Sequence, residues 1–197
     1  MIINSENATK SLYIVLLRSP TILSHIIAAL KGDEYTHAAL SLDYGLDYMF
    51  SFGRRHRRNP FVGCFKHERV TDKLYGTEKV LPGAVMELAV TQAQYDMVAG
   101  QIERFLLDNH RFGYNYLGLV RGIWGGSAHC NRRFLCSEFV YHVLSMCNAA
   151  DLQLPPEQVR PQDLLRVGRE IFKGDLKAFV RLGSPLPLMR PRIFGFG

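Results

Sequence analysis

The chain has 197 residues, of which 47% are hydrophobic, 11% aromatic and 21% charged. This composition is typical of globular proteins and excludes disordered, collagen-like and disulfide-dense scaffolds. The 24 lysines and arginines against 18 acidic residues give a net charge of +6, which does not by itself indicate nucleic-acid binding. We therefore expect a single domain over residues 1–197, with a core at about 12–182 and an extended tail at 183–197.

The first third of the chain predicts strands around one helix. The run LYIVLL at residues 12–17 is aliphatic and β-branched, which is typical of a buried strand. A Ser-Pro pair opens the segment 19–30, whose apolar residues recur at helical spacing. Residues 35–43 and 46–52 then predict the two strands of a β-hairpin.

The middle of the chain combines a basic segment with a strand and a helix. We expect residues 53–77 to form an irregular insertion or lid, with one strand near residues 61–70. Residues 84–90 predict a further strand. A Thr-x-x-Gln capping-box pattern then opens a helix predicted at 91–110.

The last third predicts mainly helices. Residues 117–124 and 134–146 carry apolar residues at helical spacing. A short helical turn is predicted at 163–168, and a closing hairpin at 170–182. Strands and helices thus fall in separate blocks, which predicts an α+β fold with an antiparallel sheet.

Cys136 is the strongest candidate for a chemically active thiol among the four cysteines. It stands at the predicted start of a helix, where unpaired backbone N–H groups and the helix dipole favour a thiolate and can stabilise an oxyanion. Arg132 and Arg133, directly upstream, add to the effect if they face the site. The alternative is that Cys136 is a small core residue, as free cysteines often are.

His37 is the candidate partner of this thiol. It lies in an apolar predicted strand, where a lone histidine is most often structural. A rigid strand can, however, hold an imidazole against a thiol. A strand histidine together with a cysteine at a helix start is the arrangement that a Cys/His nucleophile pair needs.

The order of five motifs resembles that of the circularly permuted papain-like enzymes, the YiiX-like branch of the NlpC-type superfamily, related to the lecithin:retinol acyltransferase group. The motifs are THAALSLD, YMFSFGRR, YNYLGL, FLCSEFV and VRPQDLL, and the resemblance covers Leu12 to Leu182. In the permuted branch the histidine precedes the cysteine, as His37 precedes Cys136. The resemblance implies a small, partly rolled antiparallel sheet that carries the histidine, with the catalytic cysteine at the N-terminus of a helix packed against it.

The resemblance also implies a third polar residue, on the strand after the histidine, that orients the imidazole. Across the predicted hairpin Ser51 is the polar residue nearest that place, and Glu68 and Asp43 are the alternatives. A serine can hydrogen-bond an imidazole but cannot stabilise an imidazolium by charge. Ser51 in this place therefore supports an alternative to catalysis, a catalytically weak or inactive binding module with the papain-like shape.

Two further residues are candidates for substrate binding. Arg54 opens a cluster of four arginines at residues 54–58, which we expect in an exposed loop at the mouth of the site. Its guanidinium suits a carboxylate or phosphate, so the substrate is expected to be anionic. Tyr114 is expected to line the pocket or the core.

Taken together, these residues predict a thiol-dependent hydrolase or acyltransferase acting on an amide or ester. Cys136 attacks the carbonyl, while His37 accepts the thiol proton and protonates the leaving group. The substrate is expected to be a peptide amide, a lipid ester or amide, or an isopeptide on a protein. A zinc site would need ligands such as Cys64, His67, His129 and Cys130. The Cys64-x-x-His67 pair has no matching C-x-x-C or H-x-x-x-H pair, so no metal or other cofactor is expected.

The remaining expectations concern location and partners. The N-terminus lacks a basic region followed by an apolar run, and no stretch approaches the roughly 18 apolar residues of a membrane span. We therefore expect a cytoplasmic protein without a transmembrane segment. Aromatic residues do not interleave with the basic cluster, so nucleic acid is not an expected partner. The C-terminal tail is the candidate contact for an oligomer.

Overall fold

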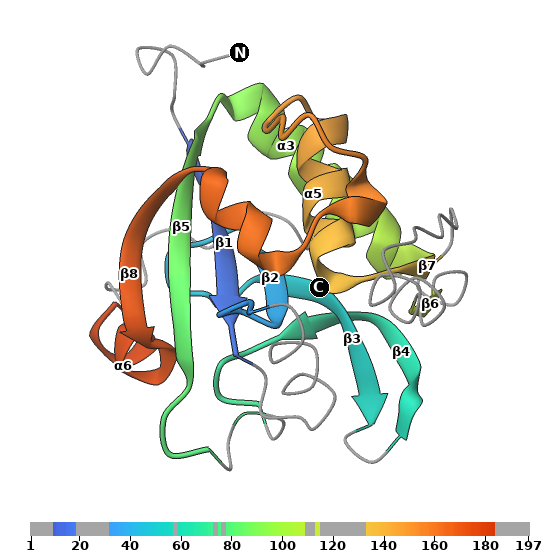
Figure 1. Cartoon of the computed structure of the whole chain (residues 1–197). Coiled ribbons are helices and arrows are strands. Elements are labelled where there is room, and N and C mark those ends of the chain that lie inside the picture. Colours follow the sequence, from blue (N-terminus) through green and yellow to red (C-terminus); the bar gives the residue numbers. More distant parts are fainter. Residues whose placement is uncertain are drawn as a thin grey trace, which may run out of the picture.

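The computed structural model describes residues 10–18, 32–56, 59–72, 75, 78–108, 113–114 and 133–183. Six antiparallel strands form one sheet in the spatial order β4-β3-β2-β1-β5-β8 (Figure 1). These strands are β1 (Lys10–Leu17), β2 (His37–Ser41), β3 (Met49–His56), β4 (Asn59–Glu68), β5 (Pro82–Val90) and β8 (Arg169–Asp175). A short parallel pair joins β6 (Gly113–Tyr114) to β7 (Arg133–Phe134). The predicted α+β class with an antiparallel sheet is confirmed.

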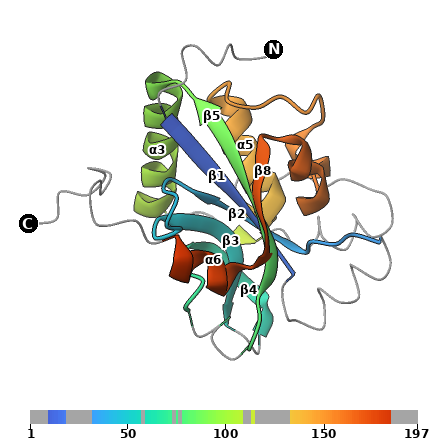
Figure 2. The same cartoon turned by 90° about the vertical axis from the view of Figure 1, so that its left-hand side faces the viewer.

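Helices cover both faces of this sheet, as Figures 1 and 2 show. The helices α3 (Gln92–Leu107) and α5 (Cys136–Met146) pack on one face, and α6 (Leu176–Leu182) packs on the other. Two 3-10 helices, η3 (Pro156–Gln158) and η4 (Pro161–Arg166), follow α5. Because β1 is covered on both faces, its apolar residues run without polar alternation.

Several predicted elements are confirmed. The strands at 12–17 and 84–90 correspond to β1 and β5, and the predicted hairpin corresponds to β2 and β3. Thr91 caps α3 in a reciprocal capping box with Gln94, as its spacing predicts. The helices predicted at 19–30 and 117–124, and residues 184–197 of the tail, lie outside the described residues.

The strand predicted near residues 61–70 corresponds to β4, but the expectation that residues 53–60 are irregular is wrong. β3 continues to His56 and pairs with β4 in a long hairpin, which projects at the lower right of Figure 1. The cross-strand partners Phe52 and Phe65 place their rings on Phe139 of α5, with centroids 5.4 and 5.2 Å away. This aromatic burial stabilises the hairpin although the segment is rich in charge. Arg54 therefore belongs to a strand and not to a loop.

The closing hairpin expected at 170–182 is also wrong. β8 pairs with β5, but the chain then enters α6. The Asp175 carboxylate accepts hydrogen bonds from the backbone N–H groups of Lys177 (3.1 Å) and Leu81 (2.8 Å). Asp175 thus caps α6 and ties it to the start of β5, so the polar turn begins a helix.

The close contact between β5 and α6 predicts opposite effects for two glycine substitutions. A Cβ on Gly83 would lie 2.5 Å from the Leu16 carbonyl oxygen and 2.6 Å from Leu176 Cδ1, whereas a Cβ on Gly100 in α3 meets nothing within 4 Å. We expect Gly83→Ala to lower the free energy of unfolding by about 1–3 kcal/mol through overpacking. Gly100→Ala is expected to raise it by about 0.5–1 kcal/mol because alanine favours the helix. Urea unfolding measures both, and a change of the same sign in the two variants would contradict this account.

Candidate active site

The edge of β2 is left unpaired next to the start of α5. β2 pairs with β1 along its whole length but with β3 only at Leu40 and Ser41. The Leu42 N–H donates to the carbonyl oxygen of Tyr48, directly before β3 (3.1 Å). Backbone N–H groups an even number of residues apart point to the same side of a strand, so the Ala38 N–H also points towards β3. Since β3 has diverged at this point, the Ala38 N–H donates to the sulfur of Cys136 instead. The divergence of β3 from β2 therefore provides a donor for a thiolate.

The start of α5 supplies a second donor. Cys136 is the first residue of this helix and is buried, and the backbone N–H of Ser137 donates to its sulfur. The Glu138 carboxylate caps the helix by accepting from the Leu135 N–H (3.0 Å). The Ser137 hydroxyl donates to the Val159 carbonyl oxygen (2.6 Å), which ties this first turn to η3. Cys136 thus occupies the predicted helix start, in an environment that favours negative charge.

His37 links Cys136 to a buried carboxylate. The imidazole is hydrogen-bonded to the Cys136 thiol, and its Nε2 lies 3.0 Å from Oε2 of Glu68. Because Nε2 faces Glu68, Nδ1 is the nitrogen left for the thiol. The Glu68 side chain is 1% exposed and that of His37 12% exposed. Thiol, imidazole and carboxylate therefore form one continuous, largely dehydrated series.

Glu68, and not Ser51, contacts the imidazole. The two-residue period of the strands puts both residues on the sheet face that carries His37. The Ser51 hydroxyl is buried but has no hydrogen-bond partner within the described part of the chain. Asp43 is occupied in the β2–β3 turn, where its carboxylate accepts from the Tyr48 N–H (2.7 Å). The expected contact between Ser51 and His37 is thus absent, and the alternative residue Glu68 takes its place.

The charges of the three groups stabilise one another. Burial by itself would lower the pKa of His37, but the Glu68 carboxylate and the Cys136 thiolate raise it to about 10. Burial would raise the pKa of Cys136, but His37 and the N–H groups of Ala38 and Ser137 lower it below its ordinary value. Burial would likewise raise the pKa of Glu68, yet His37 and Lys66 hold it well below its usual range. All three shifts therefore favour the charged forms: a thiolate at Cys136, an imidazolium at His37 and a carboxylate at Glu68.

The other two predicted site residues, Arg54 and Tyr114, both belong to strands. Arg54 pairs with Gly63 in the β3–β4 hairpin, and Tyr114 pairs with Phe134, two residues before Cys136. The side chains of Arg54 and Tyr114 lie outside the described residues. No group of three or more His, Cys, Asp or Glu side chains that could hold a metal ion occurs in the described ranges. No helix in those ranges is long and apolar enough to cross a membrane.

Two residues of the site did not emerge from the sequence. Lys66 Nζ lies 2.6 Å from Oε1 of Glu68, and the Tyr75 hydroxyl donates to Oε2 (3.3 Å). One signal was present for Lys66, because Lys66 and Glu68 are two residues apart and share a face if the segment is a strand. Tyr75 lies in a stretch of the sequence without a regular apolar pattern, so no periodicity indicates its direction.

Comparison with known proteins adds no relative. No protein-family model, no curated protein and no solved structure matches the chain. The site is therefore defined by its own geometry: a thiol at a helix start, an imidazole at a strand edge and a buried carboxylate behind it.

The geometry predicts that Glu68→Gln and Ser51→Ala differ sharply. Loss of the carboxylate charge removes the main support of the His37 imidazolium, so the Cys136 thiolate forms at higher pH. We expect Glu68→Gln to slow alkylation of Cys136 at pH 6 by about tenfold or more. Ser51→Ala is expected to leave the rate unchanged, because the hydroxyl bonds to nothing within the described residues.

Iodoacetamide labelling followed by peptide mass spectrometry gives the rate at each cysteine in one experiment. Circular dichroism at the labelling temperature confirms that both variants are folded. Equal losses in Glu68→Gln and Ser51→Ala would contradict the assignment of Glu68 as the partner of His37.

Proposed function

We propose that the protein is a thiol-dependent hydrolase or acyltransferase of the permuted papain-like class, acting on an amide or ester bond. The observation that carries this proposal is the buried series from Cys136 through His37 to Glu68. A nucleophile, a base in contact with it and a third group behind the base are the parts that covalent acyl transfer requires. The order of histidine before cysteine agrees with the resemblance to the permuted branch.

The chemistry begins with the thiolate of Cys136, which attacks the carbonyl carbon of the substrate. A sulfur–carbon bond forms and the carbonyl oxygen takes up the electron pair, next to the N–H groups of the first turn of α5. When the intermediate collapses, the leaving nitrogen or oxygen departs with its bonding pair and receives the proton of His37. Glu68 keeps the imidazolium oriented during these steps.

The second half of the reaction releases the acyl group from sulfur. Neutral His37 removes a proton from water, whose oxygen attacks the thioester carbonyl, and the Cys136 thiolate leaves. An amine or alcohol in place of water makes the same site an acyltransferase. Peptide amides, lipid esters or amides, and isopeptides all fit this chemistry, and an anionic group on the substrate remains the prediction for Arg54.

The alternative of a non-catalytic binding module loses the feature that favoured it. That alternative depended on Ser51, an uncharged residue, as the partner of the imidazole. Glu68 contacts His37 in its place, at 3.0 Å, and supplies a full negative charge. A buried carboxylate in this position suits catalysis, because it stabilises the imidazolium that forms during acyl transfer.

The proposal predicts selective acylation of Cys136 by a simple activated ester. With p-nitrophenyl acetate at pH 6, we expect an acetyl group on Cys136, an initial burst of p-nitrophenol and further turnover. Cys64 is the matched comparison, because it is more exposed than buried Cys136 and would react first if exposure decided the rate. Cys136→Ala is expected to abolish the burst and the turnover, whereas Cys64→Ala leaves both unchanged.

Peptide mass spectrometry locates the acetyl group, and absorbance follows p-nitrophenol. Acetylation that is no faster at Cys136 than at Cys64, without turnover, would overturn the proposed function and favour a binding module.

A further inference from the structure

Each oxygen of the Glu68 carboxylate faces a cationic group. Oε2 contacts Nε2 of His37 (3.0 Å) and accepts from the Tyr75 hydroxyl (3.3 Å). Oε1 lies 2.6 Å from the ammonium of Lys66, whose side chain is 23% exposed. The carboxylate therefore lies between two cationic groups, one on the reacting side and one on the solvent side.

A glycine makes room for Lys66 to reach the carboxylate. A Cβ on Gly53 of β3 would lie 2.9 Å from Lys66 Cε and 3.3 Å from Glu68 Oε1. Any side chain at position 53 would therefore displace the end of the lysine from Glu68. The closest atom is the flexible end of the lysine and no backbone atom is among the three nearest, so we expect a methyl group there to move mainly Lys66.

The titratable groups around Glu68 come from four parts of the structure. They are His37 on β2, Lys66 on β4 itself, Tyr75 before β5 and Cys136 at the start of α5. In the charged forms that these contacts favour, thiolate, imidazolium, carboxylate and ammonium alternate in sign along the series and sum to zero. Without Lys66 the same buried group carries a net negative charge, which is less favourable in a dehydrated site.

The position of Lys66 also bears on proton transfer. A carboxylate next to an imidazole makes the ring hold its proton more firmly. An imidazolium that holds its proton too firmly is a poor proton donor to a leaving group. A cation on the opposite oxygen attracts part of the carboxylate's charge and also repels the charge of the imidazolium. Both effects weaken the hold of His37 on its proton.

We propose that Lys66 is a positioning residue of this site. It holds Glu68 by its second oxygen and limits how strongly the carboxylate favours the protonated form of His37. This inference rests on the proposed function, since it assigns a role within the same acyl-transfer reaction. Lys66 touches neither the thiol nor the substrate carbonyl in this account, and it acts through Glu68 alone.

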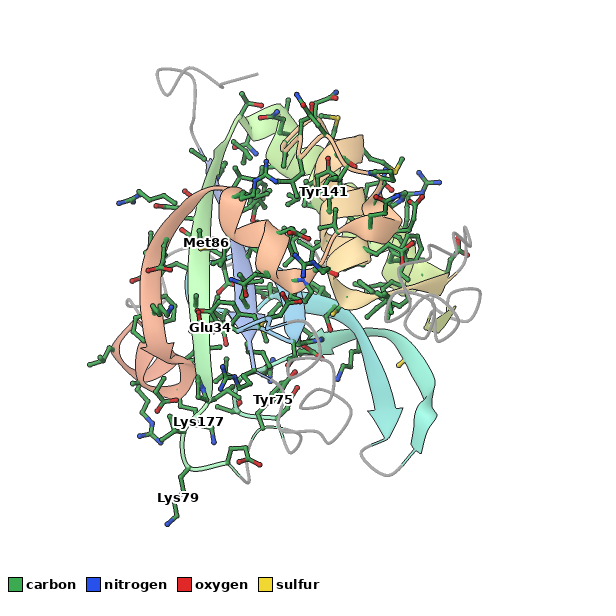
Figure 3. All side chains as sticks on the ribbon, in the orientation of Figure 1. Glu34, Tyr75, Lys79, Met86, Tyr141 and Lys177 are labelled. Atoms are coloured by element: carbon green, nitrogen blue, oxygen red, sulfur yellow. The ribbon has the colours of Figure 1, made fainter. Side chains whose placement is uncertain are left out.

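The test compares four variants of the full chain. Lys66→Met removes the ammonium, Lys66→Arg keeps a cation, and Gly53→Ala keeps the lysine but displaces it. Lys79→Met is the matched control, because Lys79 is exposed and its side chain projects away from the ribbon in Figure 3. Tyr75, which contacts Glu68, is by contrast buried beside the sheet. The pH dependence of iodoacetamide alkylation reports the Cys136 thiol, and an NMR titration of the imidazole reports His37.

We expect both midpoints to rise in Lys66→Met, because a positive charge near the site is lost. The His37 midpoint should rise by about 0.5–1 pH unit and that of Cys136 by less, since Lys66 is nearer to His37 along the series. Gly53→Ala should shift both midpoints in the same direction by a smaller amount. Lys66→Arg should restore them towards the original values, and Lys79→Met should not move them.

Other outcomes overturn the role of Lys66. Unchanged midpoints in Lys66→Met and Gly53→Ala would do so, as would slower alkylation without a shift, which indicates a structural role only. Equal shifts in Lys79→Met would mean a general charge effect. If Lys66→Met does not fold, Gly53→Ala decides the question with the lysine still present. Failure of the proposed function is distinguishable, because Cys136 would then show no preferential alkylation in the unmodified protein.

Discussion

The buried carboxylate of Glu68 is the constraint on which the rest of the site depends. A charged group at 1% exposure is costly unless every oxygen finds a partner. The partners come from three separate segments: His37 from β2, Lys66 from β4 and Tyr75 from the connection before β5. Satisfying one carboxylate therefore fixes these three segments relative to one another, and it also fixes the imidazole in the orientation that meets the thiol.

The sheet brings the thiol to this imidazole from the opposite side. α5 packs on one face, whereas His37 and Glu68 belong to the other, so the two sets of residues can meet only at a free edge. β3 creates that edge by leaving β2 after two paired residues and continuing with β4. The packing of Phe52 and Phe65 against Phe139 then holds the diverging hairpin to α5. Because β3 diverges here, the Ala38 N–H is left to donate a hydrogen bond to the sulfur of Cys136.

Local patterns predicted the elements better than the contacts between them. Short apolar runs marked β1 and β5, period-3.6 patterns marked α3 and α5, and the helix-start position of Cys136 follows from the sequence alone. The partner of His37 does not, because Ser51 and Glu68 share a face and only the length of the β3–β4 hairpin decides which of them reaches the ring. The many charged residues of that segment indicated a loop in the sequence. The hairpin is instead stabilised by aromatic packing against α5, a helix distant in the sequence.

A third segment holds the two halves of the site in register. The carbonyl oxygen of Val159 accepts from the Ser137 hydroxyl at the start of α5 (2.6 Å). One residue later, the Arg160 guanidinium pairs with buried Asp33 (3.0 Å), four residues before His37. The bridge consists of side-chain and carbonyl contacts and not of chain connectivity between histidine and cysteine. These contacts connect the first turn of α5 to the segment that leads into β2, and they therefore help to hold the Cys136 thiol against the His37 imidazole.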